Sequence, residues 1–132
     1  MLNILKISGS ALFAQSCRIN VSASNIANSE SIDKNGTPYQ SKQVIFQLDN
    51  SNYNNQIGGV KIKKIINDKK PLKLVYDPNH PFSDENGYVK MPNVNIVEEM
   101  VNTISASRSY QANIEVINTA RSMILKTLSL GQ

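Results

Sequence analysis

The sequence has 132 residues, a length that fits one domain or a helical part with a small insert. Its formal net charge is +4, but the lysines cluster between positions 61 and 73, so the rest of the chain is close to neutral. This distribution excludes a protein whose Lys and Arg cover a whole face for nucleic acid. Aromatic residues make up only 6% of the chain and Trp is absent, which predicts a modest core.

The single cysteine, Cys17, excludes a disulfide within the chain. The first residues do not read as a cleavable signal peptide, because the apolar stretch from Ala11 to Ala14 is much shorter than the apolar region of such a signal. Since the sequence contains no run of about 18 apolar residues, we expect no membrane-spanning helix.

The first predicted element is a helix from about residue 3 to 28, which no proline interrupts. Apolar residues recur in it every seven positions: Leu5, Leu12, Ile19 and Ile26. One turn after the first three of these come small residues, namely Gly9, Ser16 and Ala23. This pattern predicts a narrow apolar seam beside which another helix approaches closely. The remainder is rich in Ser and Asn, so we expect the helix to be weak or frayed in an isolated monomer.

The middle of the chain, residues 29–93, contains all five prolines. Alternating apolar residues predict two or three short strands, around residues 44–48, 60–66 and 72–76, although Ile45 and the pair Ile65–Ile66 break the alternation. The Asn- and Ser-rich stretch 49–59 is predicted to be a solvated loop, and its part 49–56 shows no motif. Residues 77–81 and 84–87 are turn formers.

A second long helix is predicted from about Asn93 or Asn95 to Leu130, a length of about 50 Å. Asn95 is expected to cap it, Glu98 and Glu99 to stabilise its first turn, and Gly131 to end it. Its apolar residues cover more than one side: Val97, Met100, Val101, Ile104, Tyr110, Ile114, Ile117, Ile124 and Leu128. Such a helix must project, pair with the first helix, or pack on other chains.

These elements predict an α+β fold, in which the two terminal helices pair in a coiled-coil-like layer and a small β-rich insert lies between them. We place the boundaries at residues 1–30 for the N-terminal helix, 31–93 for the middle lobe and 94–132 for the C-terminal helix.

The residues offer little for chemistry. His80 lies among turn formers without a second strong metal ligand, and nothing in the sequence brings it to Cys17, so we expect neither a metal site nor a nucleophile. Glu98 and Glu99 point about 100° apart on a helix, and Gly58–Gly59 lacks the residues of a phosphate-binding loop. We expect no catalytic, metal or cofactor site.

The lysine run between positions 61 and 73 has two readings. It interleaves with apolar residues, as the solvated face of a strand does, but it also suits contact with an acidic partner. Nucleic acid is disfavoured because no aromatic residue is interleaved for stacking. The alternative to an assembly subunit is therefore a secreted soluble adaptor that binds through this basic strand.

Specific strings resemble bacterial flagellar axial proteins, the rod and hook subunits. The stretch from Gly9 to Asn28, with its ending Asn-Ile-Ala-Asn, is similar to their N-terminal helix. The stretches 87–94, 99–102, 105–113 and 126–132 resemble a subunit of the proximal rod. The insert Ser29–Pro38 before Tyr39 departs from the general rod and hook pattern and agrees with that type of subunit.

The resemblance implies a structural subunit that assembles with other rod proteins into a helical tube, which transmits torque and encloses the export channel. Implied partners are copies of itself, other rod proteins, MS-ring and export-gate components at the rod base, and the flagellar type III export apparatus. The implied location is the basal-body rod in the periplasmic space, reached without a cleaved signal. The helices would form the inner layer and the middle an outer lobe.

The periodicity and the resemblance together predict a set of inter-subunit helix contacts. Its members are Leu5, Leu12, Ile19, Ile26, Val97, Val101, Ile104, Tyr110, Ile114, Ile117, Ile124 and Leu128.

Overall fold

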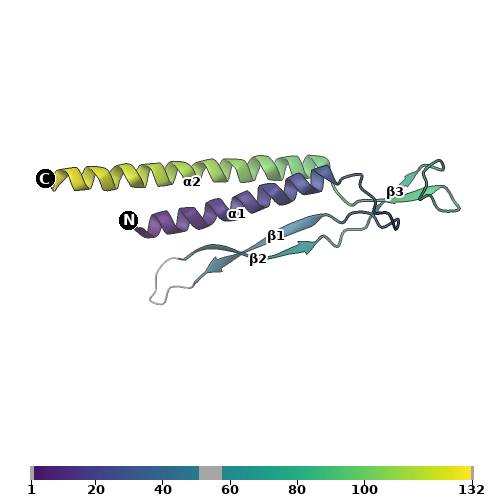
Figure 1. Cartoon of the computed structure of the whole chain (residues 1–132), viewed down its shortest axis with the longest axis horizontal. Helices are drawn as coiled ribbons and strands as arrows, with labels where there is room; N and C mark the ends of the chain where they lie inside the picture. The colour runs from purple at the N-terminus through teal and green to yellow at the C-terminus, as the bar shows by residue number, and fades with distance from the viewer. Residues whose placement is uncertain (1, 51–57, 132) are drawn as a thin grey trace.

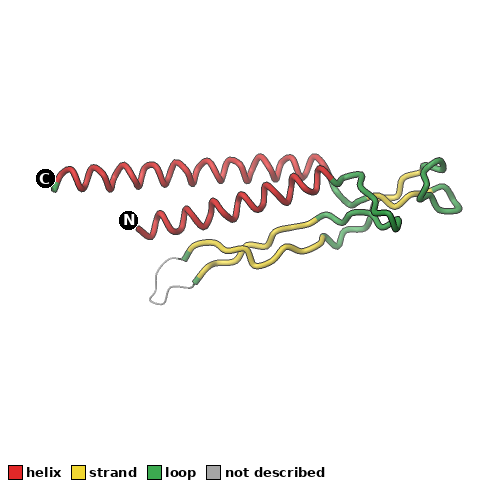
Figure 2. Tube along the Cα trace, viewed as in Figure 1, coloured by secondary structure: helices red, strands yellow, loops and turns green. Residues whose placement is uncertain are grey.

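The computed structural model describes residues 2–50 and 58–131. Two long helices, α1 (Leu2–Ala27) and α2 (Ile96–Leu130), lie side by side in opposite directions (Figure 1). A hairpin of β1 (Lys42–Asp49) and β2 (Gly59–Asn67) lies along α1. A second hairpin, β3 (Lys73–Tyr76) and β4 (Tyr88–Met91), lies beyond the end of the helix pair (Figure 2). The prediction of an α+β fold with paired terminal helices is confirmed.

Helix α1 is the middle of three layers. It packs on α2 on one side and on the β1–β2 hairpin on another (Figure 1). The pairing of α1 with α2 follows the prediction, whereas the packing of the β1–β2 hairpin along α1 was not predicted. The reason is that the middle segment folds back along the helix, which a local apolar period does not reveal. Whether α1 frays in an isolated monomer stays a prediction.

Helix α2 begins where its sequence predicts. The side-chain oxygen of Asn95 accepts hydrogen bonds from the backbone N–H groups of Val97 and Glu98, at 3.2 and 3.4 Å. These bonds satisfy two of the donors that a helix start leaves unpaired. At the other end the N–H of Gly131 donates to the carbonyl of Leu128, at 3.3 Å. Its φ of −84° shows that the helix ends without a left-handed residue.

Strands β1 and β2 pair antiparallel, from Lys42 opposite Asn67 to Asp49 opposite Gly59. The register shifts between Ile45 and Phe46, and this β-bulge leaves Lys63 without a partner on β1. A bulge resets the alternation of side chains by one residue. Because the unpaired residue lies on β2, the bulge places Ile65 on the same side as Ile62, opposite Val44 and Phe46, but it does not account for Ile45 or Ile66. The predicted loop between the strands falls largely on residues 51–57, outside the described residues.

The third predicted strand is confirmed as β3, but it does not join the first two. It pairs with β4, a strand that the apolar pattern did not predict. The rings of Tyr76 and Tyr88 meet edge-on across this pair, with centroids 5.4 Å apart. Gly87 precedes β4 at a φ of +80°, where a side chain would be strained and would also meet the Tyr76 ring.

The core is lean, as the low aromatic content predicts. Within the described residues, the apolar side chains buried on the helices are all alanines: Ala14, Ala106 and Ala120. Among the described residues, Val89 and Val94 are the largest fully buried apolar side chains, and they lie where β4 leads into α2. The two helices therefore lie close together, with small side chains and not large ones buried between them.

Candidate assembly interface

In the first turns of α2, the side that contacts α1 carries polar and small residues, and further along the same side carries half-buried Tyr110, Ile117 and Ile124. Glu99 and Asn102 both hydrogen-bond to α1 side chains. Ala106 and Ala120 follow Glu99 at multiples of seven residues, so they lie on the same side, and both are buried. This side has no large apolar side chain that the structure buries completely.

The opposite side of the first turns of α2 is apolar and uncovered. Val97 and Val101 stand two residues before and after Glu99, which places them across the helix from it. They are 69% and 61% exposed, and Ile104 is 55% exposed. We call Val97, Met100, Val101 and Ile104 the outer patch of α2. Burying one such side chain contributes about 1.5–3 kcal/mol, so the patch favours being covered.

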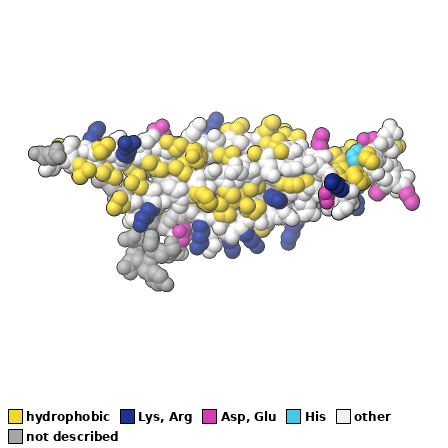
Figure 3. All heavy atoms as spheres, in the orientation of Figure 1, with side chains coloured by type: hydrophobic (Ala, Val, Ile, Leu, Met, Phe, Trp, Pro, Cys, Tyr) yellow, Lys and Arg dark blue, Asp and Glu magenta, His cyan; other side chains and the backbone are white. Residues whose placement is uncertain are grey.

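The last turns of α2 are also exposed. The helix extends past the start of α1, so its end has no helix beside it (Figure 1). Exposed apolar residues on this end are Met123, Leu125, Leu128 and Leu130. Figure 3 shows apolar side chains spread along the helices over much of the visible face.

The predicted contact residues on α1 behave differently. Leu5, Leu12, Ile19 and Ile26 are all half-buried within the single chain. On α2, Tyr110, Ile117 and Ile124 are half-buried. Ile114 and Leu128 are exposed, as are Val97, Val101 and Ile104, the three members of the outer patch that belong to the predicted set. The predicted set therefore contains both free surface and surface that the chain already covers in part.

A buried asparagine joins the helices to the hairpin. The side chain of Asn25 is 1% exposed and makes four hydrogen bonds. Its Nδ2 donates to the carbonyl of Lys42, at 2.9 Å, and to Oε1 of Glu99, at 3.1 Å. Its Oδ1 accepts from the N–H of Lys42 and the hydroxyl of Tyr39, both at 2.9 Å. We call these four residues the Asn25 junction; it satisfies every donor and acceptor of the amide.

A second asparagine joins the two hairpins. Asn93 is buried, and its Oδ1 accepts from the N–H of Ser41 at 2.8 Å. Its Nδ2 donates to the carbonyl of Lys70 at 2.9 Å. The N–H of Asp68 donates to the carbonyl of Ser41 at 2.7 Å. The start of β1, the segment after β2 and the segment before α2 are thereby held together.

Sequence reasoning missed both asparagines and the cross-helix bond of Glu99. It assigned Glu99 to the helix dipole alone, although Glu99 is buried and Glu98 is exposed. The available signal was a polar residue, Asn25, directly before Ile26 of the apolar seam. A polar side chain beside a buried seam needs a partner, but its identity depends on residues far away in the sequence.

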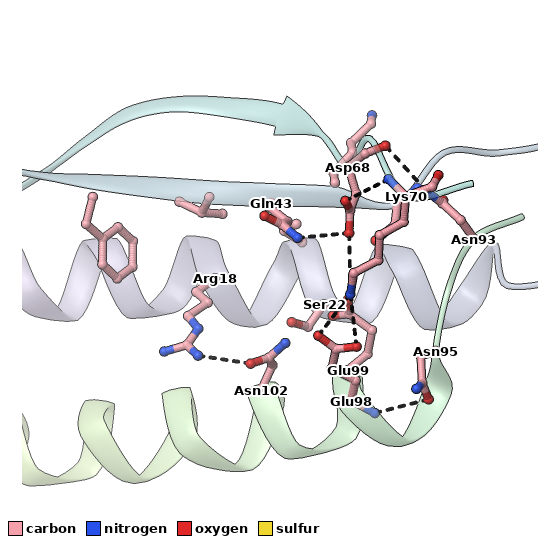
Figure 4. A pocket seen from close by; sticks show the side chains of 15 residues that line it. Arg18, Ser22, Gln43, Asp68, Lys70, Asn93, Asn95, Glu98, Glu99 and Asn102 are labelled. Atoms are coloured by element: carbon pink, nitrogen blue, oxygen red, sulfur yellow. Dashed lines mark hydrogen bonds and ion pairs between the residues drawn. The ribbon is translucent and has the colours of Figure 1, made fainter. Parts of the chain in front are cut away.

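A polar pocket of about 340 Å³ lies among α1, α2 and β1 (Figure 4). The groups around it bond to one another. Arg18 donates to Asn102 at 3.1 Å, and Gln43 donates to Asp68 at 2.9 Å. Lys70 pairs with Asp68 and Glu98, at 3.9 and 3.4 Å. These pairings favour a structural junction over a ligand site.

The other chemical candidates lie apart. Cys17 is half-buried on α1, beside Asn20 and Ile65. His80 lies in the connection between β3 and β4, which extends beyond the helix pair, and its Nδ1 accepts from the N–H of Phe82 at 3.2 Å (Figure 1). In the described part of the chain, no group of three or more His, Cys, Asp and Glu side chains is placed to hold a metal.

Part of the lysine run is engaged within the chain. The ammonium group of Lys73 donates to the carbonyl of Val94 at 2.6 Å, and Lys61 pairs with Asp49 at 3.7 Å. Lys63 and Lys64 are exposed at the bulge of β2. Figure 3 shows Lys and Arg along the edge of the molecule where the β1–β2 hairpin lies. Neither α1 nor α2, over the residues that are described, is long and apolar enough to cross a membrane.

Comparison with known proteins identifies both ends of the chain. Residues 5–30 match a family model described as flagella basal body rod protein. Residues 85–130 match the model of the flagellar basal body rod FlgEFG protein C-terminal region. The matched ranges contain most of α1 and of α2.

Full-length relatives agree with these matches. A flagellar basal-body rod protein FlgC of Salmonella typhimurium is 60% identical over the whole chain, which covers 98% of that protein. The FlgC proteins of Escherichia coli O157:H7 and of Buchnera aphidicola from Schizaphis graminum are 59% and 60% identical with the same coverage.

Proposed function

The chain belongs to the FlgC family of flagellar basal-body rod proteins, and from this premise we propose how it assembles. It is a structural rod subunit of the basal body. We propose that it occupies the proximal part of the rod and that its two terminal helices form the contacts with neighbouring subunits. The observation that carries this proposal is the outer patch of α2, an apolar surface with a polar inner side behind it.

The proposed contacts fall into two groups. Val97, Val101, Ile104, Ile114 and Leu128 offer exposed surface, which assembly would cover. The other members are half-buried and contribute the remaining part of their surface: Leu5, Leu12, Ile19, Ile26, Tyr110, Ile117 and Ile124. Since the exposed group has more area to lose, it is expected to dominate the free energy of association.

The partners and the route belong to the same proposal. Partners are further copies of the chain, other rod proteins, and MS-ring and export-gate components at the rod base. The subunit reaches the periplasmic part of the basal body through the flagellar type III export apparatus, without a cleaved signal. It has a structural and not a catalytic role, which the naming of its relatives as rod proteins supports. The same names favour a rod subunit over the soluble adaptor.

The proposed division of the chain follows from these roles. Residues 1–30 and 94–132 form the assembling helical core, and residues 31–93 form the lobe that the core carries. The β1–β2 hairpin packs along α1, so the first half of this lobe stiffens the core. The β3–β4 hairpin lies beyond the helices and is the part of the lobe that projects (Figure 1).

The test places charge in the outer patch. The double variant Val101→Asp/Ile104→Asp is expressed in a flagellated bacterium that lacks its own copy of this subunit. It should be exported at the parental level, but it should be missing from purified basal bodies, and the cells should not swim, because two carboxylates cannot be buried against an apolar neighbour.

The matched control is Gln111→Asp/Asn118→Asp, which adds the same two charges at exposed polar positions of the same helix. It should assemble and support swimming. Incorporation of the Val101→Asp/Ile104→Asp variant into basal bodies would overturn the assigned contact, and loss of its export would assign the two residues to export instead.

A further inference from the structure

The α1–α2 contact has little in it that selects one alignment of the two helices. The apolar seam of α1 repeats every seven residues, and so do its inward positions Ser8, Gln15 and Ser22. Ala106, Asn113 and Ala120 repeat at the same interval on α2. Sliding one helix by seven residues, about 10 Å, again places members of these rows opposite each other, Ser or Gln on α1 and Ala or Asn on α2.

The Asn25 junction breaks this repeat. The positions seven and fourteen residues before Asn25 are Arg18 and Ala11, and neither is an amide. The positions seven and fourteen residues after Glu99 are Ala106 and Asn113, and neither is a carboxylate. The hydrogen bond of 3.1 Å from Asn25 to Glu99 therefore forms in a single alignment.

One slipped alignment would gain a favourable pair of its own and therefore competes with the observed alignment. Moving α2 by seven residues brings Glu99 to the position of Arg18, whose guanidinium now donates to Asn102. An arginine opposite a carboxylate is a favourable pair. The observed alignment prevails only if the Asn25–Glu99 bond, together with the Arg18–Asn102 bond that a slip would also break, outweighs that gain.

Asn25 is also fixed from outside the helix pair. Its remaining bonds go to Lys42 and Tyr39, which hold the amide in one orientation against the start of β1. An amide held in this way presents its second N–H to α2 at one height along α1.

We propose that Asn25 is a positioning residue that sets the register of α2 on α1 by acting through Glu99. Buried polar pairs that select one alignment of packed helices are known, and they act at the cost of some stability. The inference concerns the isolated chain and does not depend on the rod assignment, so its failure is separate from failure of the assembly test.

The experiment measures the alignment directly in the full-length chain. In a Cys17→Ser background, nitroxide labels are attached through Asn20→Cys on α1 and Ser122→Cys on α2, two exposed positions far apart along the pair. A slip of seven residues changes the distance between the labels by about 10 Å. The parent should give one distance.

Two variants remove the Asn25–Glu99 pair, one with a single hydrogen bond and the other with all four bonds of the Asn25 amide. Glu99→Leu removes only the bond to α2, whereas Asn25→Leu removes all four bonds of the amide. Each should give a second distance, displaced by about 10 Å. Glu99→Gln keeps an acceptor oxygen and should restore the single parental distance. The matched control Asn28→Leu should also keep it, because the Asn28 amide bonds only to the Ser24 carbonyl of its own helix turn.

Every other result counts against the proposal. A single parental distance in folded Glu99→Leu would show that the register is set elsewhere. Loss of helical circular dichroism in both leucine variants, without a second distance in either, would reduce the pair to a stabilising contact. If only Asn25→Leu unfolds, Glu99→Leu decides.

Discussion

On α2, the side that contacts α1 carries Glu99, Asn102 and Ala106, whereas the opposite side carries Val97, Val101 and Ile104. A helix on the surface of a monomeric domain normally has the reverse distribution, with its apolar side inward. In these first turns, hydrogen bonds and small side chains therefore organise the contact with α1, and the apolar side chains of the outer patch stay available for other molecules.

The largest change in the free energy of unfolding is expected from a bulky side chain on the side of α2 that contacts α1. Ala106 is 0% exposed, so Ala106→Leu forces the two helices apart. The free energy of unfolding should fall by about 1–3 kcal/mol, measured by urea denaturation followed by circular dichroism. The neighbouring exposed substitution Ser105→Leu should change it by less than about 0.5 kcal/mol. Equal losses in both variants would contradict the close approach.

Two glycines, Gly59 on β2 and Gly9 on α1, allow a similar comparison. A Cβ at Gly59 would clash with the Ser10 hydroxyl oxygen, because β2 packs against α1 at that point. Gly59→Ala should therefore lower the free energy of unfolding by about 1–2 kcal/mol. Gly9 has nothing within 4 Å, and Gly9→Ala should raise it by about 0.5–1 kcal/mol. Destabilisation by both alanines would show that Gly9 already faces a neighbour.

The third prediction concerns the Asn95 cap, which stabilises the first turn of α2, the turn in which both the inner contact and the outer patch begin. Asn95→Ala removes the acceptor for the N–H groups of Val97 and Glu98 and should lower the free energy of unfolding by about 1 kcal/mol, measured by thermal or urea denaturation. Asn95→Asp keeps an acceptor there and should retain most of the stability. An alanine variant as stable as the parent would mean that the first turn is held by Glu99 and the Asn25 junction alone.

The smallest effect is expected on the outer patch in the isolated chain. Val101→Ser should change the free energy of unfolding by less than about 0.5 kcal/mol, because Val101 is mostly exposed. A loss above 1 kcal/mol in urea would indicate that the patch is already covered in the monomer, and the contrast between the two sides of α2 would then disappear.

The sequence was most informative where structure depends on local pattern. The helix ends, the Asn95 cap and the first three strands follow from periodicity and from residues within one turn of each other. Strand β4 was missed because its sequence shows no clear alternation over four residues, and its pairing with β3 depends on the turn between them. The contact of Asn25 with Glu99 spans 74 positions, and no local rule reaches that far. The bulge at Lys63 likewise appears only when both strands are aligned.

The β1–β2 hairpin is fastened to α1 at two distant points. Near one end, Asn25 exchanges two hydrogen bonds with the backbone of Lys42; near the other, the hydroxyl of Ser10 accepts from the N–H of Val60 at 3.0 Å. A hairpin bound to the helix at one end only would detach from it one hydrogen bond at a time when pulled. Because this hairpin is bound near both ends, a force along the helix is shared by both attachments, which must break together. In a structural subunit of the basal-body rod, this geometry makes the hairpin a support along the length of the helix.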